Sequence, residues 1–393
     1  MISTPKRLPA ELVERMISIR RRIHEYPELS NQEHRTQALV VEELRSSGIT
    51  AIEEVAGTGL VVNIAGGSPG KTLVLRADMD ALPIQEDCPE LAFASKVDGV
   101  MHACGHDAHT AILVGATSAL HESREHISGN VRCIFQPAEE AEPLGGREVV
   151  RSGALDGADA ALALHVDPEL AAGTVGVREG AMLAGGMEFT LTINGRSAHA
   201  ARPHQGVDTI YVAAAVVQGL QSIVSRRVNP LEPFVLTIGK IHGGTAKNII
   251  ADKTVIEGTV RMLSEKLREQ VPILIRETAQ SISQSHGANA TLEVSPGEPV
   301  LENDPAVVAL ARESAKAVLG SANVIELTTG SMGSEDFAFY TKAIPGAMFR
   351  LGIRAPGDNK SSPLHHPRLH VDESALAAGA AVFVEAARRF LSE

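Results

Sequence analysis

The chain has no tryptophan, and aromatic residues make up only 3% of its 393 residues. A surface on which nucleic-acid bases stack needs aromatic side chains, and this sequence offers few of them. The formal net charge is −12 at pH 7, and an acidic protein repels phosphate groups. We therefore expect no nucleic-acid partner.

Cysteines are also few, and the three present are Cys88, Cys104 and Cys133. This small, odd number argues against a disulfide framework and favours a reducing compartment, although any one pair could still form. No stretch approaches the roughly 18 apolar residues of a membrane span, and residues 1–10 lack the apolar centre of a signal peptide. The sequence predicts a soluble, cytoplasmic protein that does not act at a membrane.

The length favours two domains, or one large domain with an insertion. Amphipathic spacing predicts helices over residues 12–23 and 108–120. A capping-box pattern of Ser30 and Glu33 predicts a further helix, which Gly48 closes. Short β-rich or apolar runs predict strands at 60–64, 72–75, 131–135 and 160–164. Strands that alternate with helices in this way indicate an α/β sheet.

The pattern changes near Gly185. Residues 187–193 alternate as a half-exposed strand does, and the following helices and strands give the order β-α-β-β-α-β. This order is typical of a ferredoxin-like sandwich. After Pro296 the α/β pattern resumes, with helices at 305–319 and 374–391 and a strand at 347–351. We therefore expect one α/β domain built from residues 1–184 and 297–393, with an inserted domain at 185–296.

Residues 101–109, which read MHACGHDAH, hold a thiol, three imidazoles and a carboxylate within nine positions. These side chains bind zinc-like ions, and Cys104 and His106 lie on either side of a glycine, so both can turn toward one point. The alternative interpretation is a surface loop with scattered histidines. Further ligands elsewhere in the chain would decide between the two.

Other candidate ligands follow predicted strands. Glu139 and Glu140 follow the strand at 131–135, where one carboxylate could bind a metal while its neighbour acts as general base. His165 follows an apolar run, and His365 lies in a loop that prolines stiffen. Taken singly, these residues are also consistent with a solvated acidic turn, a core histidine and a surface loop. Together they match what a two-metal hydrolase requires.

Five strings resemble the di-metal family of aminoacylases, hippurate hydrolases and auxin-conjugate amidohydrolases. They lie at 75–83, 101–109, 136–140, 163–165 and 364–365, in the order that the family has. The resemblance implies a zinc-peptidase-like α/β catalytic domain with an inserted ferredoxin-like dimerisation or lid domain. It also implies two divalent metal ions per subunit and a homodimer or higher homo-oligomer.

The resemblance assigns a role to individual residues. The implied metal ligands are Cys104, His106, Glu140, His165 and His365, and the implied general base is Glu139. His365 is preferred over His366, because family members place the ligand directly after the residue that is Leu364 here. Asp80 resembles an aspartate that orients a ligand. Asp78 stands where the wider peptidase family has a histidine ligand, so its role stays open, and both aspartates could instead cap turns.

The inserted domain carries further matches. His199, in the string at 195–199, resembles a histidine that reaches the active site of the neighbouring subunit in dimeric relatives and stabilises the oxyanion there. Asn248 and Arg261 resemble residues that hold the substrate's carboxylate, and arginine suits a planar carboxylate. The string at 333–337 also matches the family, with no role assigned to it.

The implied reaction is hydrolysis of the amide bond of an N-acyl-amino acid, with water as nucleophile and Glu139 as the proton acceptor. Zinc, manganese, nickel or cobalt could serve as the metal. One alternative is a metallocarboxypeptidase that acts on short peptides. A Cys104 nucleophile is another, and a non-catalytic binding protein on the same scaffold is a third, against which the intact ligand set argues.

Overall fold

The computed structural model describes residues 8–358 and 362–392, so residues 1–7, where the sequence predicts no signal peptide, lie outside the described residues. The described chain divides into two compact units. The first unit comprises Met1–Gly180, Glu302–Thr329 and Asp336–Glu393, and the second comprises Ala181–Leu301 and Gly330–Glu335. The second unit extends past the predicted insert, 185–296, at both ends and includes a short segment that sequence patterning did not assign to it.

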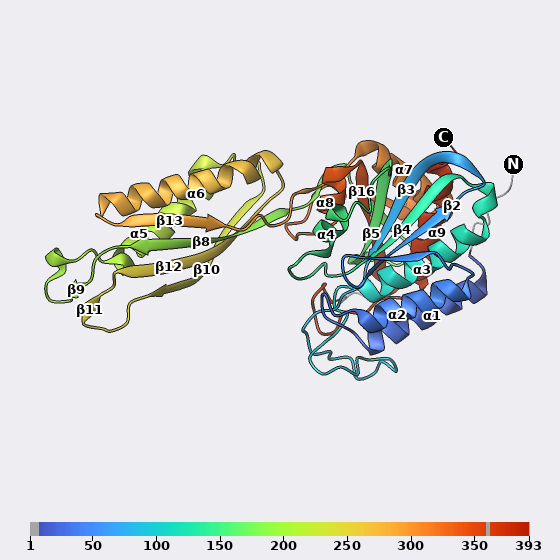
Figure 1. Ribbon diagram of the computed structural model, residues 1–393, viewed down its shortest axis with the longest axis horizontal. Coiled ribbons are helices and arrows are strands. Elements are labelled where there is room, and N and C mark those ends of the chain that lie inside the picture. Colours follow the sequence, from blue (N-terminus) through green and yellow to red (C-terminus); the bar gives the residue numbers. More distant parts are fainter. Residues whose placement is uncertain (1–7, 359–361, 393) are drawn as a thin grey trace. The chain divides into compact units, whose positions relative to one another are not determined.

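The first unit is built on an eight-stranded sheet with the order β1-β2-β4-β3-β5-β16-β6-β15 (Figure 1). The four central strands, β4, β3, β5 and β16, run parallel to one another. The inner residues of β3, β5 and β16 are buried without alternation, as in a sheet that is covered on both faces. The strands are β1 (Ile52–Val55), β2 (Gly59–Ala65), β3 (Ser68–Asp78), β4 (Ser128–Gln136), β5 (Ala160–Ala171), β6 (Val175–Val177), β15 (Val324–Glu326) and β16 (Gly346–Arg354).

Helices cover this sheet, which confirms the predicted α/β class (Figure 1). They are α1 (Ala10–Glu25), α2 (His34–Ser46), α3 (His106–Glu122), α4 (Gly145–Arg151), α7 (Pro305–Leu319), α8 (Ala338–Ala343) and α9 (Ser374–Phe390). α3 packs against α1 and α9 and is buried along almost its whole length. A Cβ atom at Gly115 would lie 2.3 Å from the sulfur of Met16, so this glycine allows α1 to approach α3 closely.

The predicted capping box at the start of α2 is wrong. α2 begins at His34, and Glu33 is its N-cap residue without a capping hydrogen bond from its side chain. The hydroxyl of Ser30 donates instead to the carboxylate of Asp80 (2.6 Å). The predicted end of the helix is confirmed, because Gly48 adopts a φ of 81° just past α2.

The second unit has the predicted order β-α-β-β-α-β. Its four-stranded antiparallel sheet has the order β10-β12-β8-β13, and α5 and α6 pack on the sheet and on each other (Figure 1). This is the strand order of a ferredoxin-like sandwich, with the first strand between the third and the fourth. The elements are β8 (Gly185–Asn194), α5 (Thr209–Ser222), β10 (Phe234–Gly243), β12 (Lys253–Met262), α6 (Glu265–Ser285) and β13 (Asn289–Val294).

Four short strands complete the described chain: β7 (Gly180–Leu183), β9 (Ala198–His199), β11 (Ile249–Ile250) and β14 (Leu301–Asn303). No helix among the described residues is long and apolar enough to cross a membrane.

Alternation along β8 builds the core of the second unit, since Met187, Phe189, Leu191 and Ile193 are buried and the residues between them are more exposed.

We expect Leu191→Ala to lower the free energy of unfolding of the second unit by about 2–5 kcal/mol, because the truncation leaves a cavity in a fully buried position. Glu188→Gln, on the exposed face of the same strand, is the matched control and should change it by less than about 0.5 kcal/mol. Urea denaturation followed by circular dichroism measures both. Equal effects of the two substitutions would contradict the assigned register of β8.

Candidate metal centre

Three parallel strands of the first unit bring Glu139, Glu140 and His165 to one end of the sheet. β3 ends at Asp78, β4 ends at Gln136 shortly before Glu139, and His165 lies on β5. The carboxyl ends of parallel strands meet at the same edge of a sheet, so residues that follow them lie close together. The sequence predicted that the strand would end at 164, whereas β5 continues through His165 to Ala171.

A glycine shapes the loop that precedes α3. Gly105 adopts a φ of 87°, and a Cβ atom there would lie 2.5 Å from a methyl carbon of Val166. Both the backbone conformation and the close approach require glycine. The turn places Cys104 at the end of the loop and His106 at the first position of the helix, and both side chains are buried.

Cys104, His106 and His165 form a first group of potential ligands, whose ligand atoms lie within 4.8 Å of one another. The sulfur of Cys104 is 3.4 Å from Nε2 of His165. His165 donates its Nδ1 proton to the carbonyl oxygen of Val166 (2.8 Å). Burial lowers the pKa of His165 well below its usual value. The ring is therefore neutral, with the lone pair of Nε2 toward the sulfur.

Cys104, Glu140 and His365 form a second group within the same distance. Nε2 of His365 lies 3.2 Å from Oε1 of Glu140. Hydrogen bonds with Cys104 and Glu140 raise the pKa of His365 to about 10. The backbone N–H of His365 donates to the carbonyl of Ala103 (2.7 Å), which ties this loop to the loop before α3. His366 belongs to no such group among the described residues, and its Nδ1 accepts the backbone N–H of Arg368.

Glu139 lies in a third group with His106 and Glu140. Oε1 of Glu140 and Nε2 of His106 are 4.0 Å apart, so both ligand candidates lie beside the carboxylate that the sequence predicts to be the base. All six residues assigned from the sequence to the metals and the base thus meet in overlapping groups in the first unit. Their individual roles stay a prediction.

The donor set fits divalent cations. His106 uses Nδ1 to donate to the backbone and side chain of Asp80, at 2.9 and 3.2 Å, and its buried Nε2 has no hydrogen-bond partner among the described residues. Burial raises the pKa of the Cys104 thiol, so its thiolate needs a nearby cation. A thiolate, neutral imidazoles and carboxylates are ligands for zinc and similar ions, and the two groups that share Cys104 could hold two of them.

Asp80 organises this centre from behind. Besides receiving Nδ1 of His106, its Oδ2 accepts the hydroxyl of Ser30 (2.6 Å) and the backbone N–H of Glu140 (3.0 Å). One buried carboxylate therefore orients two of the candidate ligands, as carboxylates behind metal-bound histidines commonly do. This arrangement supports the predicted orienting role of Asp80.

Asp78, whose role the sequence left open, is fully buried and bonded on both oxygens. Oδ2 accepts a hydrogen bond from Nη1 of Arg76 (2.6 Å), and Oδ1 accepts one from Nδ1 of His109 (2.6 Å). Nε2 of His109 in turn accepts the backbone N–H of Val166 (2.9 Å), directly after His165. The sequence placed His109 only near the start of the helix predicted at 108–120. Its contacts show instead that it joins three elements beneath the ligands.

The string at 333–337, which had no assigned role, contributes Asp336 to the same buried network. Oδ1 of Asp336 accepts Nη2 of Arg76 (2.8 Å) and the amide of Gln136 (2.8 Å). Oδ2 accepts the backbone N–H of Gly146 (2.6 Å). No local pattern in the sequence indicates these partners. An aspartate directly before a phenylalanine in a family string was the sole signal, and it did not specify a contact.

The remaining predicted site residues lie in the second unit. His199, on β9, is exposed and pairs with Ile249 of β11, and the carbonyl of Asn248 accepts the N–H of Ala200 (3.1 Å). His199 and Asn248 are therefore in adjacent segments. Arg261 lies on β12 with its guanidinium 3.6 Å from the carboxylate of Glu298, and its Nη1 makes no hydrogen bond within the described residues. The roles of these three residues stay a prediction.

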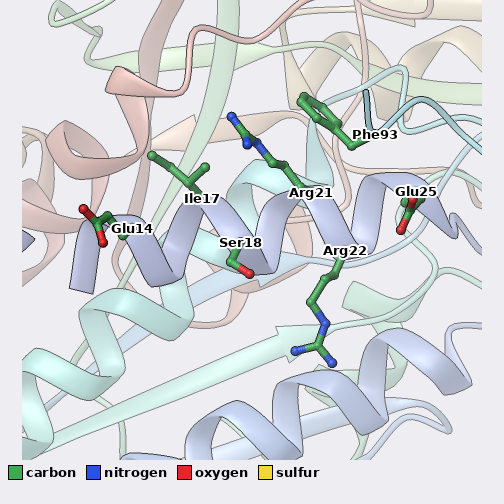
Figure 2. Close-up of a pocket in the computed structure, with 7 residues that line it drawn as sticks. All are labelled: Glu14, Ile17, Ser18, Arg21, Arg22, Glu25 and Phe93. Atoms are coloured by element: carbon green, nitrogen blue, oxygen red, sulfur yellow. The ribbon is translucent and has the colours of Figure 1, made fainter. Parts of the chain in front are cut away.

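A surface pocket of about 390 Å³ lies along α1, outside the groups of potential ligands. Figure 2 shows Arg21 reaching from α1 toward Phe93, whose ring centre is 5.0 Å from the guanidinium carbon. Its two arginines are already paired, since Arg21 binds Glu373 and Arg22 binds Glu43. The pocket therefore offers no chemistry comparable to that of the metal centre.

Comparisons with known proteins agree with this chemistry. A profile described as "Peptidase family M20/M25/M40" matches residues 74–389. An N-acetyl-L-cysteine deacetylase of Bacillus subtilis is 43% identical over 97% of this chain and 89% of its own length. Thermostable carboxypeptidase 1 of Saccharolobus solfataricus is 38% identical over 94% of both chains. The crystal structure of a dinuclear metal-binding peptidase of the M20 family from Bacillus subtilis superposes with a TM-score of 0.85 at 36% identity, covering 98% of this chain and 99% of that one. The chain belongs to the peptidase family M20/M25/M40.

Proposed function

We propose that this protein hydrolyses the amide bond of N-acyl-amino acids, releasing a carboxylic acid and a free amino acid. Its relatives include a deacetylase, a carboxypeptidase and a dinuclear metal-binding peptidase, which together support metal-dependent amide hydrolysis. One observation carries the proposal. The potential ligand atoms of His106 and Glu140 lie within 4.8 Å of each other and of the Glu139 carboxylate, and both residues belong to further groups that share Cys104. The 43% identity to an N-acetyl-L-cysteine deacetylase favours an acyl substrate over a peptide.

The chemistry divides between cations and side chains. Divalent ions bound by Cys104, His106, Glu140, His165 and His365 would polarise the amide carbonyl and acidify water. Glu139 accepts the proton of the attacking water and returns it to the departing amine, which needs a carboxylate within hydrogen-bonding reach of both. Asp80 keeps His106 and Glu140 in place throughout, through its hydrogen bonds to each.

The second unit supplies substrate recognition in this proposal. His199 stabilises the oxyanion in the active site of a partner subunit, so the working form is a homodimer. Arg261 and Asn248 bind the free carboxylate of the amino acid, for which the planar guanidinium is suited. The exposed side chain of His199 is open to a ligand, whereas the guanidinium of Arg261, 3.6 Å from Glu298, would exchange that carboxylate for the substrate's.

A carboxypeptidase activity on short peptides is the second candidate, favoured by the 38% identity to a thermostable carboxypeptidase. Both reactions attack an amide next to a free carboxylate, so the same base and ligands would serve. The acyl pocket decides between them. A difference of one methylene there changes selectivity by only about 1–3 kcal/mol, so substrate assays are needed.

We expect the metal-loaded protein to hydrolyse N-acetyl-, N-benzoyl- or indole-acetyl-amino acids with a higher kcat/KM than dipeptides. Glu139→Gln should lower kcat by about 10²- to 10⁴-fold on every substrate, because the amide cannot accept the proton. Release of free amino acid measures both, and metal content measured on each protein is the control. Preference for dipeptides would favour the carboxypeptidase, and full activity of Glu139→Gln would refute the assigned base.

Chelation should abolish activity, and manganese, cobalt, nickel or zinc should restore it. Cys104→Ser should weaken metal binding by at least about tenfold, because it removes the thiolate that both ligand groups share. Cys88→Ser, which alters a buried thiol outside those groups, is the matched control and should retain the metal. Activity that persists after complete metal removal would support a Cys104 nucleophile instead.

Mixing two inactive variants tests whether His199 acts across a dimer. Glu139→Gln and His199→Ala homodimers should each be nearly inactive, whereas a mixed dimer contains one site with both native groups. Random exchange of subunits should therefore recover up to about one quarter of the wild-type activity. Recovery is measured after mixing under conditions that allow subunit exchange. Mixing that restores nothing, although exchange occurs, would place His199 and Glu139 in the same subunit's site, and a His199→Ala homodimer that keeps its activity would remove His199 from the reaction.

A further inference from the structure

The turn that carries Glu139 and Glu140 has an unusual backbone. Ala138, directly before the base, adopts a φ of 48°, in the left-handed region that non-glycine residues seldom occupy. Such a conformation persists only where its surroundings hold it. Two backbone N–H groups of this turn are held by carboxylates: that of Glu140 by Asp80 (3.0 Å) and that of Ala138 by Glu33 (2.9 Å).

Glu33 is fully buried, and three segments of the chain donate to its carboxylate. Oε1 accepts the backbone N–H groups of Asn31 and Ala138, both at 2.9 Å. Oε2 accepts the hydroxyl of Thr58 (2.5 Å). The carboxylate therefore joins the segment before α2, the start of β2 and the turn of the base.

The helix that Glu33 precedes does not need this carboxylate. The backbone N–H groups of Arg35 and Thr36, in the first turn of α2, donate to the carboxylate of Glu28 at 3.0 and 2.8 Å. Glu33 makes no capping hydrogen bond from its side chain. Its bond to Ala138 is thus a contact over a long sequence separation, made beside the local bond from Asn31 and in place of a cap on α2.

We propose that Glu33 is a positioning residue for the general base: its hydrogen bond to Ala138 holds the left-handed turn that aims the Glu139 carboxylate. This inference rests on the proposed role of Glu139. Glu33 does not touch the reacting atoms, and it acts through the backbone of the turn. Displacement of a base by about 1 Å can lower the rate about 100-fold, so loss of this hydrogen bond can reduce the rate strongly.

Two substitutions of Glu33 separate the effect of side-chain length from the effect of charge. Glu33→Gln removes the charge but keeps an oxygen that can accept from Asn31 and Ala138, while its amide can donate to Thr58. Glu33→Asp keeps the charge but shortens the side chain by about 1.5 Å. Thr58→Val removes only the donor to the other oxygen and is the matched control.

Steady-state kinetics at saturating metal test the proposal on any amide that the wild type hydrolyses. We expect Glu33→Asp to lower kcat by about 10- to 100-fold with little change in KM, since the loss arises in the transition state. Glu33→Gln and Thr58→Val should stay within about threefold of wild type. A Glu33→Gln variant as impaired as Glu33→Asp, or a folded Glu33→Asp variant with normal kcat, would overturn the proposal.

Hydrogen exchange of the Ala138 amide provides a readout that needs no activity. Mass spectrometry of overlapping peptides should show this amide protected in the wild type and in Glu33→Gln, and exchanging faster in Glu33→Asp. If the protein hydrolyses no amide, the proposed function fails, while the exchange result still tests the hydrogen bond between Ala138 and Glu33. Equal protection of Ala138 in all variants would show that Glu33 does not hold the turn and would overturn the inference.

Discussion

The candidate metal centre depends on one buried carboxylate, that of Asp78. It sits at the end of β3 without solvent exposure and receives Arg76 and His109, each at 2.6 Å. Burial opposes its ionisation, but the charges of His106 and Arg76 and the hydrogen bond from His109 outweigh burial and lower the pKa of Asp78 well below its usual value. Removing one partner of a buried pair costs about 3–5 kcal/mol, because the other charge is left uncompensated. The end of β3 is therefore fixed to the first turn of α3.

The hydrogen bond between Asp78 and His109 also fixes the position of β5. A backbone N–H can only donate, so the bond from Val166 to Nε2 of His109 requires an unprotonated Nε2 and places the proton on Nδ1, toward Asp78. The ring of His109 then lies 5.4 Å from that of His106 and 4.8 Å from that of His165, measured between ring centres. The spacing of two candidate ligands follows from a polar core beneath them and not from the loop before α3 alone.

The sequence indicated the residues that the structure brings together at the candidate metal centre, but not the residues that support them, for a physical reason. Strand ends are visible locally, and parallel strands bring their carboxyl ends together, so Glu140 and His165 could be expected near each other. Supports form over long separations that no periodicity records: Arg76 and Asp336 are 260 residues apart. Ser30 and Glu33 illustrate the failure. Their spacing fits a capping box, yet both side chains turn away from α2, toward Asp80 and the turn at Ala138.

The supports also explain how a site rich in carboxylates can be built before any cation binds. Arg76, His109 and backbone N–H groups neutralise or solvate Asp78, Asp80 and Glu33, so these three remain fixed acceptors. The candidate ligands are left in the opposite state, since burial raises the pKa of Cys104 and Nε2 of His106 is unbonded. Ligands that must lose a proton to bind a metal couple binding to proton release. The supporting carboxylates thus have their hydrogen-bond partners within the protein. The candidate ligands keep unpaired donor atoms, which a cation can bind.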